Sequence, residues 1–351
     1  MSSLKKELVN LAMKKGATNA RITTTERMAG GPPSADPTYV LPEARSVVVF
    51  VVGIDRSFIP DYFGKVSRME FKHIMYNTYQ LLGAIGQELV DYLHSLGFKA
   101  FCPAPNICYR KGVGEPHCLA PDFSHRYAAL ASGLATQGWS GNVLTLGYRA
   151  SAFYCSVITD AELEADEPLD EELCDRCKLC TLVCPGQFFS PNESEAFTLG
   201  GREYVSARKR SDLRCAVVCE GLTGIANNRK WSTWSTVGIV LPEDDDALPS
   251  VAEQAAAEPA TQHILPRVRA SKGEDYGVRG VLNRTLEDTN PTCGNCFLVC
   301  SGSRERRKKL VELLHSSGVM AWKDGQEVAT NADTQKSQAL RQVLKQIGDF
   351  S

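Results

Sequence analysis

The sequence predicts an α+β fold in which a layered domain precedes a cysteine-rich module. Helical and strand patterns alternate over the first 170 residues, as they do where helices pack on a sheet. Beyond that point the cysteines gather in two short motifs. The chain of 351 residues is long enough for more than one domain. We therefore expect a layered domain at 1–170, a cysteine-rich module at 171–302 with an insertion at about 241–285, and a helix–hairpin–helix extension at 303–351.

The layered domain has a regular order of elements. Leu4, Leu8 and Leu11 recur at helical spacing, a β-branched run follows at 46–52, and Gly97 closes a long amphipathic segment. The proline-rich stretch 29–42 reads as a loop. Helices are predicted over 4–16, 72–96 and 124–134, and strands over 18–23, 46–52, 99–102, 142–146 and 152–158.

The second half of the chain has fewer regular signals. A polar segment follows Cys184, and a short helix over 212–220 is expected to present Cys215. Acidic, alanine-rich and proline-broken sequence after residue 241 predicts an inserted, mobile loop. A basic helix over 303–316, a hairpin around Asp324-Gly325 and a terminal helix complete the prediction.

The most informative stretch is the run of Cys174, Cys177, Cys180 and Cys184, followed by Pro185. Its C-x2-C-x2-C-x3-C-P spacing is that of bacterial ferredoxins that bind [4Fe–4S] clusters. In two-cluster ferredoxins the fourth cysteine of such a run ligates the other cluster. The run therefore predicts a second cluster and a set of cysteines elsewhere in the chain.

A second motif supplies those cysteines. Cys293, Cys296 and Cys300 form C-x2-C-x3-C, with Cys215 and Cys219 available between the motifs. The predicted ligands of one cluster are Cys174, Cys177, Cys180 and Cys300, and those of the other are Cys184, Cys293, Cys296 and one of Cys215 and Cys219. A zinc site would require paired C-x2-C units, and disulfides are not expected without a secretory signal. Ser301 stands where a proline usually follows the last cysteine.

Composition limits the partners. With 39 basic and 41 acidic residues and an isoelectric point near 6.3, the chain has no general attraction for polyanions, so a nucleic-acid partner is not expected. Thirteen cysteines without a signal peptide indicate a reducing cytoplasm in which thiols bind metal. The longest apolar run, 47–52, is too short to span a bilayer. We expect a cytoplasmic protein without a membrane partner.

Residues 103–123 form a long irregular segment of a kind that is usually functional. Cys102, Cys108, Cys118 and His117 lie in or beside it. No two of these side chains have the spacing of a chelate, so scattered thiols are favoured over a further metal site.

The stretch 122–145 contains a candidate cofactor site. A polar helix start near Ser124 is followed by a glycine-rich turn around Gly141 and by a strand, and glycine lets a backbone approach a bulky ligand closely. On its own this pattern is also typical of ordinary packing.

The order of several motifs resembles a known superfamily. Ser124-His125-Arg126 leads through two alanines to Gly133-Leu134, Gly141-Asn142 leads to Thr145, and Ile158-Thr159-Asp160 precedes the cysteine run. This order is similar to that of the cobalamin-dependent epoxyqueuosine reductases and reductive dehalogenases. The resemblance covers roughly residues 40–225 and 290–302.

The resemblance implies a nitroreductase-like three-layer domain that binds base-off cobalamin, fused to a ferredoxin module with two [4Fe–4S] clusters. Electrons from an external donor such as ferredoxin or flavodoxin would then reach cobalt through the clusters. The cofactor-binding residues that it implies are Ser124, Arg126, Gly133, Gly141, Asn142, Thr145 and Thr159. It also favours Cys215 over Cys219 as the eighth cluster ligand.

The chain departs from both families in places. It has no twin-arginine signal, which the respiratory dehalogenases carry, and no helical-repeat domain, with which epoxyqueuosine reductases usually continue. The acid before the Ser-His-Arg helix is Asp122, at a shifted spacing. The cobalamin motif Asp-x-His-x-x-Gly is absent, since the nearest candidate, at Asp91, His94 and Gly97, has one residue too many.

The favoured function is a cytosolic reductase that cleaves a C–X or C–O bond of a small molecule. The alternatives are a protein that delivers electrons to a separate corrinoid protein, and a tRNA epoxyqueuosine reductase. A reductase needs a proton donor, for which the candidates are Asp122 and His125. An aspartate before this helix is also an ordinary N-cap, so the two roles of Asp122 remain open.

Overall fold

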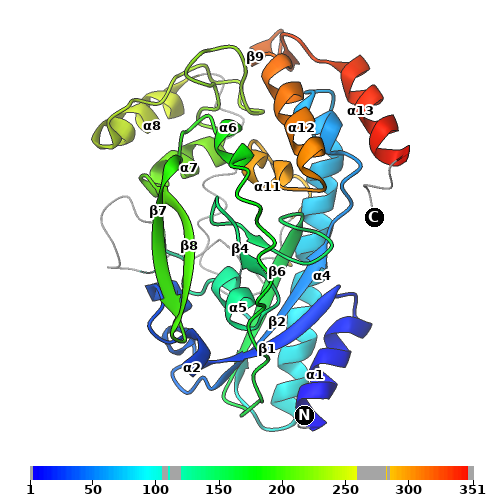
Figure 1. The fold of residues 1–351 in the computed structure, drawn as a ribbon, viewed down its shortest axis with the longest axis vertical. Helices are drawn as coiled ribbons and strands as arrows, with labels where there is room; N and C mark the ends of the chain where they lie inside the picture. The colour runs from blue at the N-terminus through cyan, green and yellow to red at the C-terminus, as the bar shows by residue number, and fades with distance from the viewer. Residues whose placement is uncertain (1–2, 105–109, 111–119, 259–281, 283–284, 347–351) are drawn as a thin grey trace.

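A four-stranded antiparallel sheet lies at the centre of the first half of the chain (Figure 1). This computed structural model describes residues 3–104, 110, 120–258, 282 and 285–346. The strand order is β1 (Asn19–Thr24), β2 (Ser46–Gly53), β6 (Ala152–Thr159) and β3 (Ala100–Phe101). The fold is therefore mixed α/β, and each of these strands lies where its sequence pattern predicts.

The central strand β2 is buried along nearly its whole length because helices cover both faces of the sheet. Side chains alternate between the faces of a strand. Val48 and Phe50 accordingly pack against α1 (Ser3–Lys14) and α4 (Met69–Ser95), whereas Val47 and Val49 pack against α5 (His125–Ala131). A run of β-branched residues suits such a strand.

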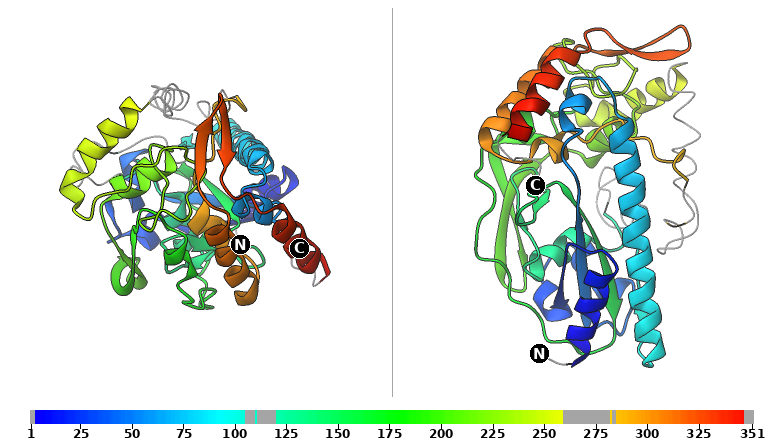
Figure 2. Two further views of the ribbon diagram at one scale, coloured as in Figure 1. Left: turned by 90° about the horizontal axis from the view of Figure 1, so that it is seen from above. Right: turned by 90° about the vertical axis from the view of Figure 1, so that its right-hand side faces the viewer.

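Helix α4 is the longest element and follows much of the long axis of the molecule (Figure 2). Its C-terminal half packs on the sheet through Leu82, Leu89 and Leu93. Its N-terminal turn packs through Phe71 in a separate core with the C-terminal elements. Gly97 ends the helix with a φ of +85°, as predicted.

The second half of the chain surrounds the upper end of α4. Three short helices carry cysteines: α6 (Leu179–Leu182), α7 (Asp212–Cys219) and α11 (Asn295–Val299). The extension consists of α12 (Arg304–Ser316), the hairpin β9–β10 (Met320–Lys323 and Gln326–Ala329) and α13 (Thr334–Gln346), as predicted. Short elements complete the described fold: α2 (Thr25–Met28), η1 (Pro33–Ala35), η2 (Pro37–Tyr39), α3 (Ile59–Phe63), β4 (Thr136–Gln137) and β5 (Val143–Leu144).

Side chains from both sides of residue 170 pack together. One core joins Ile59 and Phe71 from the first half with Val183 of the cysteine run, Leu298 of α11 and Leu310 of α12. The cysteine-bearing helices are thus held directly against the end of α4.

The second half contains one hairpin for which no prediction was made and one segment whose prediction was wrong. The polar segment after Cys184 is a long hairpin, β7 (Phe189–Leu199) and β8 (Arg202–Lys209), whose Gly200-Gly201 turn has φ values of +54° and +81°. Such a two-residue turn is the usual signal for a hairpin. The expected loop after residue 241 contains η3 (Asp245–Ala247) and α8 (Leu248–Ala257), because Asp245 pairs with Arg210 and Arg214 and Leu248 is buried. The rest of that loop lies outside the described residues.

Within the described residues, no helix combines the length and the apolar character that a bilayer crossing requires.

Candidate iron–sulfur and cofactor site

Four cysteines from two distant parts of the chain line one cavity. Cys174, Cys177 and Cys180 come from the first motif and Cys300 from the end of α11, and the cavity contains about 340 Å³ of empty space. Burial, with the neighbouring sulfurs of Cys300, Cys177 and Cys174, raises the pKa of Cys180 to about 12. We refer to these four residues as the first cysteine group.

The loop of the first group has an unusual backbone. Arg176 and Lys178 adopt left-handed conformations, with φ of +48° and +59°. For residues with a Cβ this conformation costs roughly 1–2 kcal/mol each. Left-handed residues interleaved in a loop turn successive N–H groups toward one point, a geometry found at phosphate and iron–sulfur sites. The loop therefore suits an anionic group at the centre of the cavity.

A second set of cysteines lies close to the first. Burial raises the pKa of Cys184 to about 12, and the sulfurs of Cys293 and Cys215 lie near it. Cys296 has Cys215, Cys293 and Cys184 as neighbours. We refer to these four residues as the second cysteine group.

Cys219 adjoins the second group. Its sulfur lies 3.7 Å from that of Cys215, one helical turn away on α7, and it also contacts Cys293. It is not among the sulfurs that neighbour Cys184 or Cys296. The geometry thus places Cys215 more centrally in this group than Cys219.

Each motif divides its cysteines between the groups. Cys180 lies on α6 and Cys184 just after it, and Cys296 and Cys300 lie on α11 and at its end. The two helices pack together, and the Asn295 side-chain amide donates to the Val183 carbonyl at 3.0 Å. This packing brings Cys300 to the first three cysteines of the first motif and Cys184 to the first two of the second.

The described cysteines are all free thiols, and within the described chain no three potential ligands converge as they do on a single ion. A [4Fe–4S] cube binds four thiolates. Two further observations fit such a group. Arg149 and Arg307 line the first cavity with Nε atoms that are buried without a hydrogen-bond partner. The buried Tyr62 hydroxyl also lies beside Cys293, next to the backbone of Gly294.

An open cleft adjoins the second group and contains about 770 Å³ of empty space. Asn142 connects the two: it lines the cleft, and its side-chain amide donates to the Cys296 sulfur at 3.6 Å. Other lining residues come from α5, β6, α4 and α11; they include Ser124, His125, Arg126, Phe153, Tyr154, Tyr79 and Phe297.

The predicted cofactor residues divide into three sets. Ser124, Arg126 and Asn142 line the cleft. Gly141 and Thr145 lie directly behind the lining: the Gly141 carbonyl accepts from Arg126 at 3.4 Å, and the Thr145 hydroxyl is 2.8 Å from that of Tyr154. The third set is not brought to the cleft and has structural partners instead.

That third set consists of Gly133 and Thr159. A Cβ at Gly133 would lie 2.1 Å from the Glu167 carbonyl oxygen, so this glycine allows the 167–169 segment to pack closely. The buried hydroxyl of Thr159, at the far end of β6, donates to the Lys99 carbonyl at 2.8 Å.

The N-cap of α5 is Ser124, whose side chain accepts from the Tyr127 amide. The capping interpretation of Asp122 was therefore wrong. Asp122 is partly buried between Pro121 and Phe123, which both line the cleft, and burial raises its pKa while Arg110 opposes that shift.

His125 is only 7% exposed and lines the cleft, and neither of its ring nitrogens has a hydrogen-bond partner among the described residues. Burial lowers its pKa to about 4, an effect that the nearby Pro103 carbonyl opposes. Burial therefore favours the neutral ring near pH 7, and the role of His125 as a proton donor stays a prediction.

Sequence reasoning missed Tyr154 and Trp139. The Tyr154 hydroxyl lines the cleft, and its pKa is raised by burial. The Trp139 amide donates to the Cys174 sulfur at 3.3 Å, while its carbonyl and indole are held by Ala207 and Ser190 of the β7–β8 hairpin. Alternation along β6 could have indicated Tyr154, but no local signal links Trp139 to a cysteine 35 residues away.

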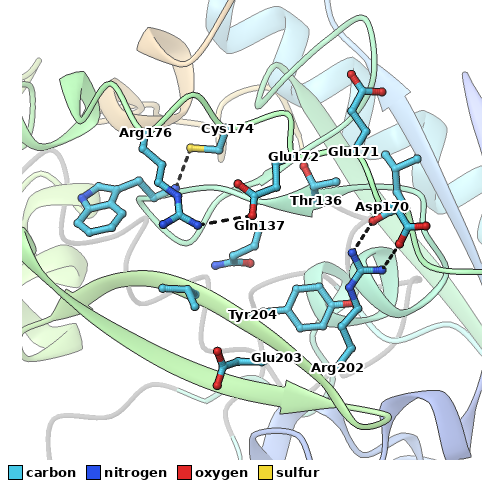
Figure 3. A pocket seen from close by; sticks show the side chains of 13 residues that line it. Thr136, Gln137, Asp170, Glu171, Glu172, Cys174, Arg176, Arg202, Glu203 and Tyr204 are labelled. Carbon is cyan, nitrogen blue, oxygen red and sulfur yellow. Dashed lines mark hydrogen bonds and ion pairs between the residues drawn. The ribbon is translucent and has the colours of Figure 1, made fainter.

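A second opening reaches the first group from the hairpin side (Figure 3). It lies between β8 and the 169–176 segment and contains about 610 Å³ of empty space. Arg202 of β8 pairs with Asp170 across it at 3.1 Å, and Arg176 pairs with Glu172 within the 169–176 segment at 3.5 Å. Cys174 lies at its inner end, so the first group approaches solvent here.

Comparisons with known proteins give structural neighbours only. No protein-family model matches the chain, and no curated protein matches it. The catabolic reductive dehalogenase NpRdhA is similar at 15% identity and a TM-score of 0.43, over 79% of this chain and 37% of that one. The chain thus spans just over a third of the length of that dehalogenase.

Epoxyqueuosine reductases are also similar. The enzyme from Streptococcus thermophilus has 12% identity and a TM-score of 0.42, over 99% of this chain and 100% of that one. The enzyme from Bacillus subtilis has 14% identity and a TM-score of 0.40, over 90% and 82%. These neighbours are reductases of the two kinds that the sequence resembles.

Proposed function

We propose that the chain is a reductase that depends on cobalamin and two [4Fe–4S] clusters and cleaves a C–X or C–O bond of a small molecule. The observation that carries the proposal is the position of Asn142. Its side chain lines the open cleft and donates to a cysteine of the second group. A site for a reaction and a site for electron carriers are therefore in contact.

The residues suit the proposed cofactors. Each cysteine group supplies the four thiolates that a [4Fe–4S] cluster requires. Tyr79, Phe153 and Phe297 give the cleft aromatic walls for a large flat ligand, and Arg126 offers donors to its amide substituents. When bound, the clusters supply one-electron transfer and the cobalamin supplies a reducible cobalt.

The same proposal assigns roles to the parts of the fold. The sheet with helices on both faces is taken as the nitroreductase-like cobalamin domain at 1–170, and the segments around the cysteine groups as the two-cluster ferredoxin module at 171–302. The substrate would enter the cleft, and an external donor such as ferredoxin or flavodoxin would supply electrons. Base-off binding of cobalamin is part of this proposal.

Asp122 is the residue that we assign to the proton. Burial raises the pKa of Asp122, which favours the protonated carboxyl, and its neighbours Pro121 and Phe123 both line the cleft. His125 remains neutral and orients the ligand through its ring nitrogens. Tyr154 is the other hydroxyl in reach of the cleft, but its bond with Thr145 and its raised pKa make it a weaker acid.

Anaerobic reconstitution tests the proposal. The protein is loaded with iron and sulfide, mixed with cobalamin, passed over a gel-filtration column and examined by visible spectroscopy. We expect co-elution of cobalamin, with the absorbance shift of a displaced lower base. Iron–sulfur absorbance without retained cobalamin would instead indicate a protein that delivers electrons to a separate corrinoid protein. Turnover is then measured with halogenated aromatics, and with an epoxyqueuosine-containing tRNA stem loop as the alternative substrate.

Two glycine variants make the test local. Gly141→Trp should lower cobalamin retention while preserving iron, because its backbone lies between Arg126 and Asn142 of the cleft and a Cβ there meets Lys209 at 3.0 Å. Gly147→Trp is the control: its φ of +79° is nearly the same as the +78° of Gly141, and it is exposed with open space around it.

A further inference from the structure

Positive charge is concentrated around the first cysteine group. The side chains that line its cavity include three cations, Arg149, Lys178 and Arg307, against one carboxylate, Asp175. Three positive charges and one negative leave a net charge of +2. Lys178 is held in place over the Trp139 ring, with its Nζ atom 4.8 Å from the ring centroid.

The side chains of Arg149 and Arg307 are both shielded from solvent, to different degrees. The Arg307 side chain is 2% exposed; it pairs with Asp175 and donates to the Gly302 carbonyl at 2.8 Å. Arg149 is 22% exposed and reaches the same carboxylate at 3.5 Å. Two guanidinium groups thus share one carboxylate, and a buried cation without full compensation is costly.

Both arginines also retain an unused donor. Their Nε atoms are buried and have no hydrogen-bond partner in the described part of the chain. Arg149 and Arg307 lie near the Cys300 sulfur, and both oppose the rise in its pKa that burial causes. Buried N–H groups are rarely left unpaired, so the two Nε–H groups are available to donate to an acceptor bound in the cavity.

The surroundings of the second group are different. Arg126 and Asp212 lie near Cys215 and balance one another, and Cys296 receives its hydrogen bond from the neutral amide of Asn142. These two charges act on Cys215 with opposite signs, whereas the side chains that line the first cavity carry a net charge of +2.

We infer that Arg149 and Arg307 are tuning residues for the cluster that the first group holds, and that they make it the more easily reduced of the two. The inference rests on the proposed function, since it requires both clusters. Reduction adds one electron from an external one-electron donor and neither forms nor breaks a bond. The reduced form carries one more negative charge, which nearby cations and N–H donors stabilise. Charge and hydrogen bonding to sulfur are established determinants of cluster potential.

Redox titration followed by electron paramagnetic resonance tests the inference on the reconstituted full-length protein, with dithionite as reductant. We expect two midpoint potentials. In Arg149→Gln the higher of the two midpoints should fall by at least about 59 mV, a tenfold fall in the equilibrium constant for one-electron reduction, while the lower midpoint stays unchanged. Arg149→Lys keeps the charge but loses the planar fork of donors, so its shift should be smaller.

Arg202→Gln is the matched control, because Arg202 pairs with Asp170 on the same side of the molecule but does not line the cavity. A shift as large as that of Arg149→Gln would overturn the inference, as would unchanged potentials in Arg149→Gln. Arg307→Gln, measured in parallel, should move the same midpoint as Arg149→Gln; movement of the other midpoint also overturns the inference. Absence of iron–sulfur signals from the unmodified protein would instead refute the proposed function.

Discussion

The exchange of cysteines between the two motifs can be tested with double variants. In the geometry described here Cys174 and Cys300 share a cavity, although they belong to different motifs and lie 126 residues apart in sequence. Cys296 and Cys300 belong to one motif but lie in different groups. Two substitutions within one group should remove one cluster, whereas one substitution in each group should impair both.

The expected magnitudes follow from four thiolates per cluster. The unmodified chain should bind about eight iron and eight sulfide, and Cys174→Ala with Cys300→Ala should retain about four of each, because the second group keeps all of its ligands. Cys296→Ala with Cys300→Ala should retain clearly less than four, because neither group keeps four cysteines. Anaerobic iron and sulfide analysis measures this, with far-ultraviolet circular dichroism to check folding.

Single variants of α7 provide the control. Cys219→Ala should retain about eight iron, and Cys215→Ala should lose about half, if Cys215 is the eighth ligand. The opposite result would make Cys219 the eighth ligand and would leave the other seven ligand assignments unchanged. The reasoning is refuted if Cys174→Ala with Cys300→Ala loses both clusters while Cys296→Ala with Cys300→Ala keeps one, since the motifs would then not exchange a cysteine.

Three further predictions concern the cleft and the fold. Asp122→Asn should load cobalamin normally but lower turnover by roughly 10²-fold, the usual size of a general-acid contribution, and an unchanged rate would remove Asp122 from that role. Burial depresses the pKa of His125 from 6.5 to about 4. The contribution of the buried neutral ring to stability, about 3 kcal/mol, is fully present above pH 6.5 and is lost as the pH falls through 4. Urea melts of His125→Gln should therefore show a weaker dependence of stability on pH over that window, and an unaltered dependence would contradict the burial argument. Burial also lowers the pKa of Lys65 to about 7, from 10.5, so the buried amine destabilises the fold below pH 7 and stability recovers as the pH rises toward 10.5. Lys65→Met should therefore raise the melting temperature at pH 6 more than at pH 10, and an equal change at both would show that the charge is not responsible.

Local sequence determined much of the fold. The β-branched run of β2, the helical spacing in α1 and α4, and Gly97 after α4 each act over a few residues, so their patterns predicted the elements closely. The Asp324-Gly325 turn was predicted for the same reason, and the structure gives both residues positive φ. The β7–β8 hairpin carried an equally local signal at Gly200-Gly201, but β7 is mostly polar and exposed, so it lacks the alternation that marks a half-buried strand.

Spacing by itself also predicted that the cysteines bind iron–sulfur clusters, because a C-x2-C-x2-C loop can place three thiolates around one cube. It could not distinguish Cys215 from Cys219, which lie one helical turn apart on the same helix. Cys215 lies beside Cys184 and Cys296, and Cys219 lies beside Cys215 and Cys293, so the choice of Cys215 as the eighth ligand stays a prediction. Helix orientation depends on packing between elements that are distant in sequence.

The tertiary structure alone decided which predicted residues meet. Gly133 and Thr159 were predicted to bind cofactor together with Ser124 and Asn142. In the structure Gly133 packs against Glu167, and the Thr159 hydroxyl donates to the Lys99 carbonyl. The charge on Arg149 and Arg307 is visible in the sequence, but their burial beside Cys300 is not. Burial, the sharing of one carboxylate and the environment that sets a pKa all depend on contacts between distant segments. Those contacts exist only after α6, α11 and the sheet have packed together.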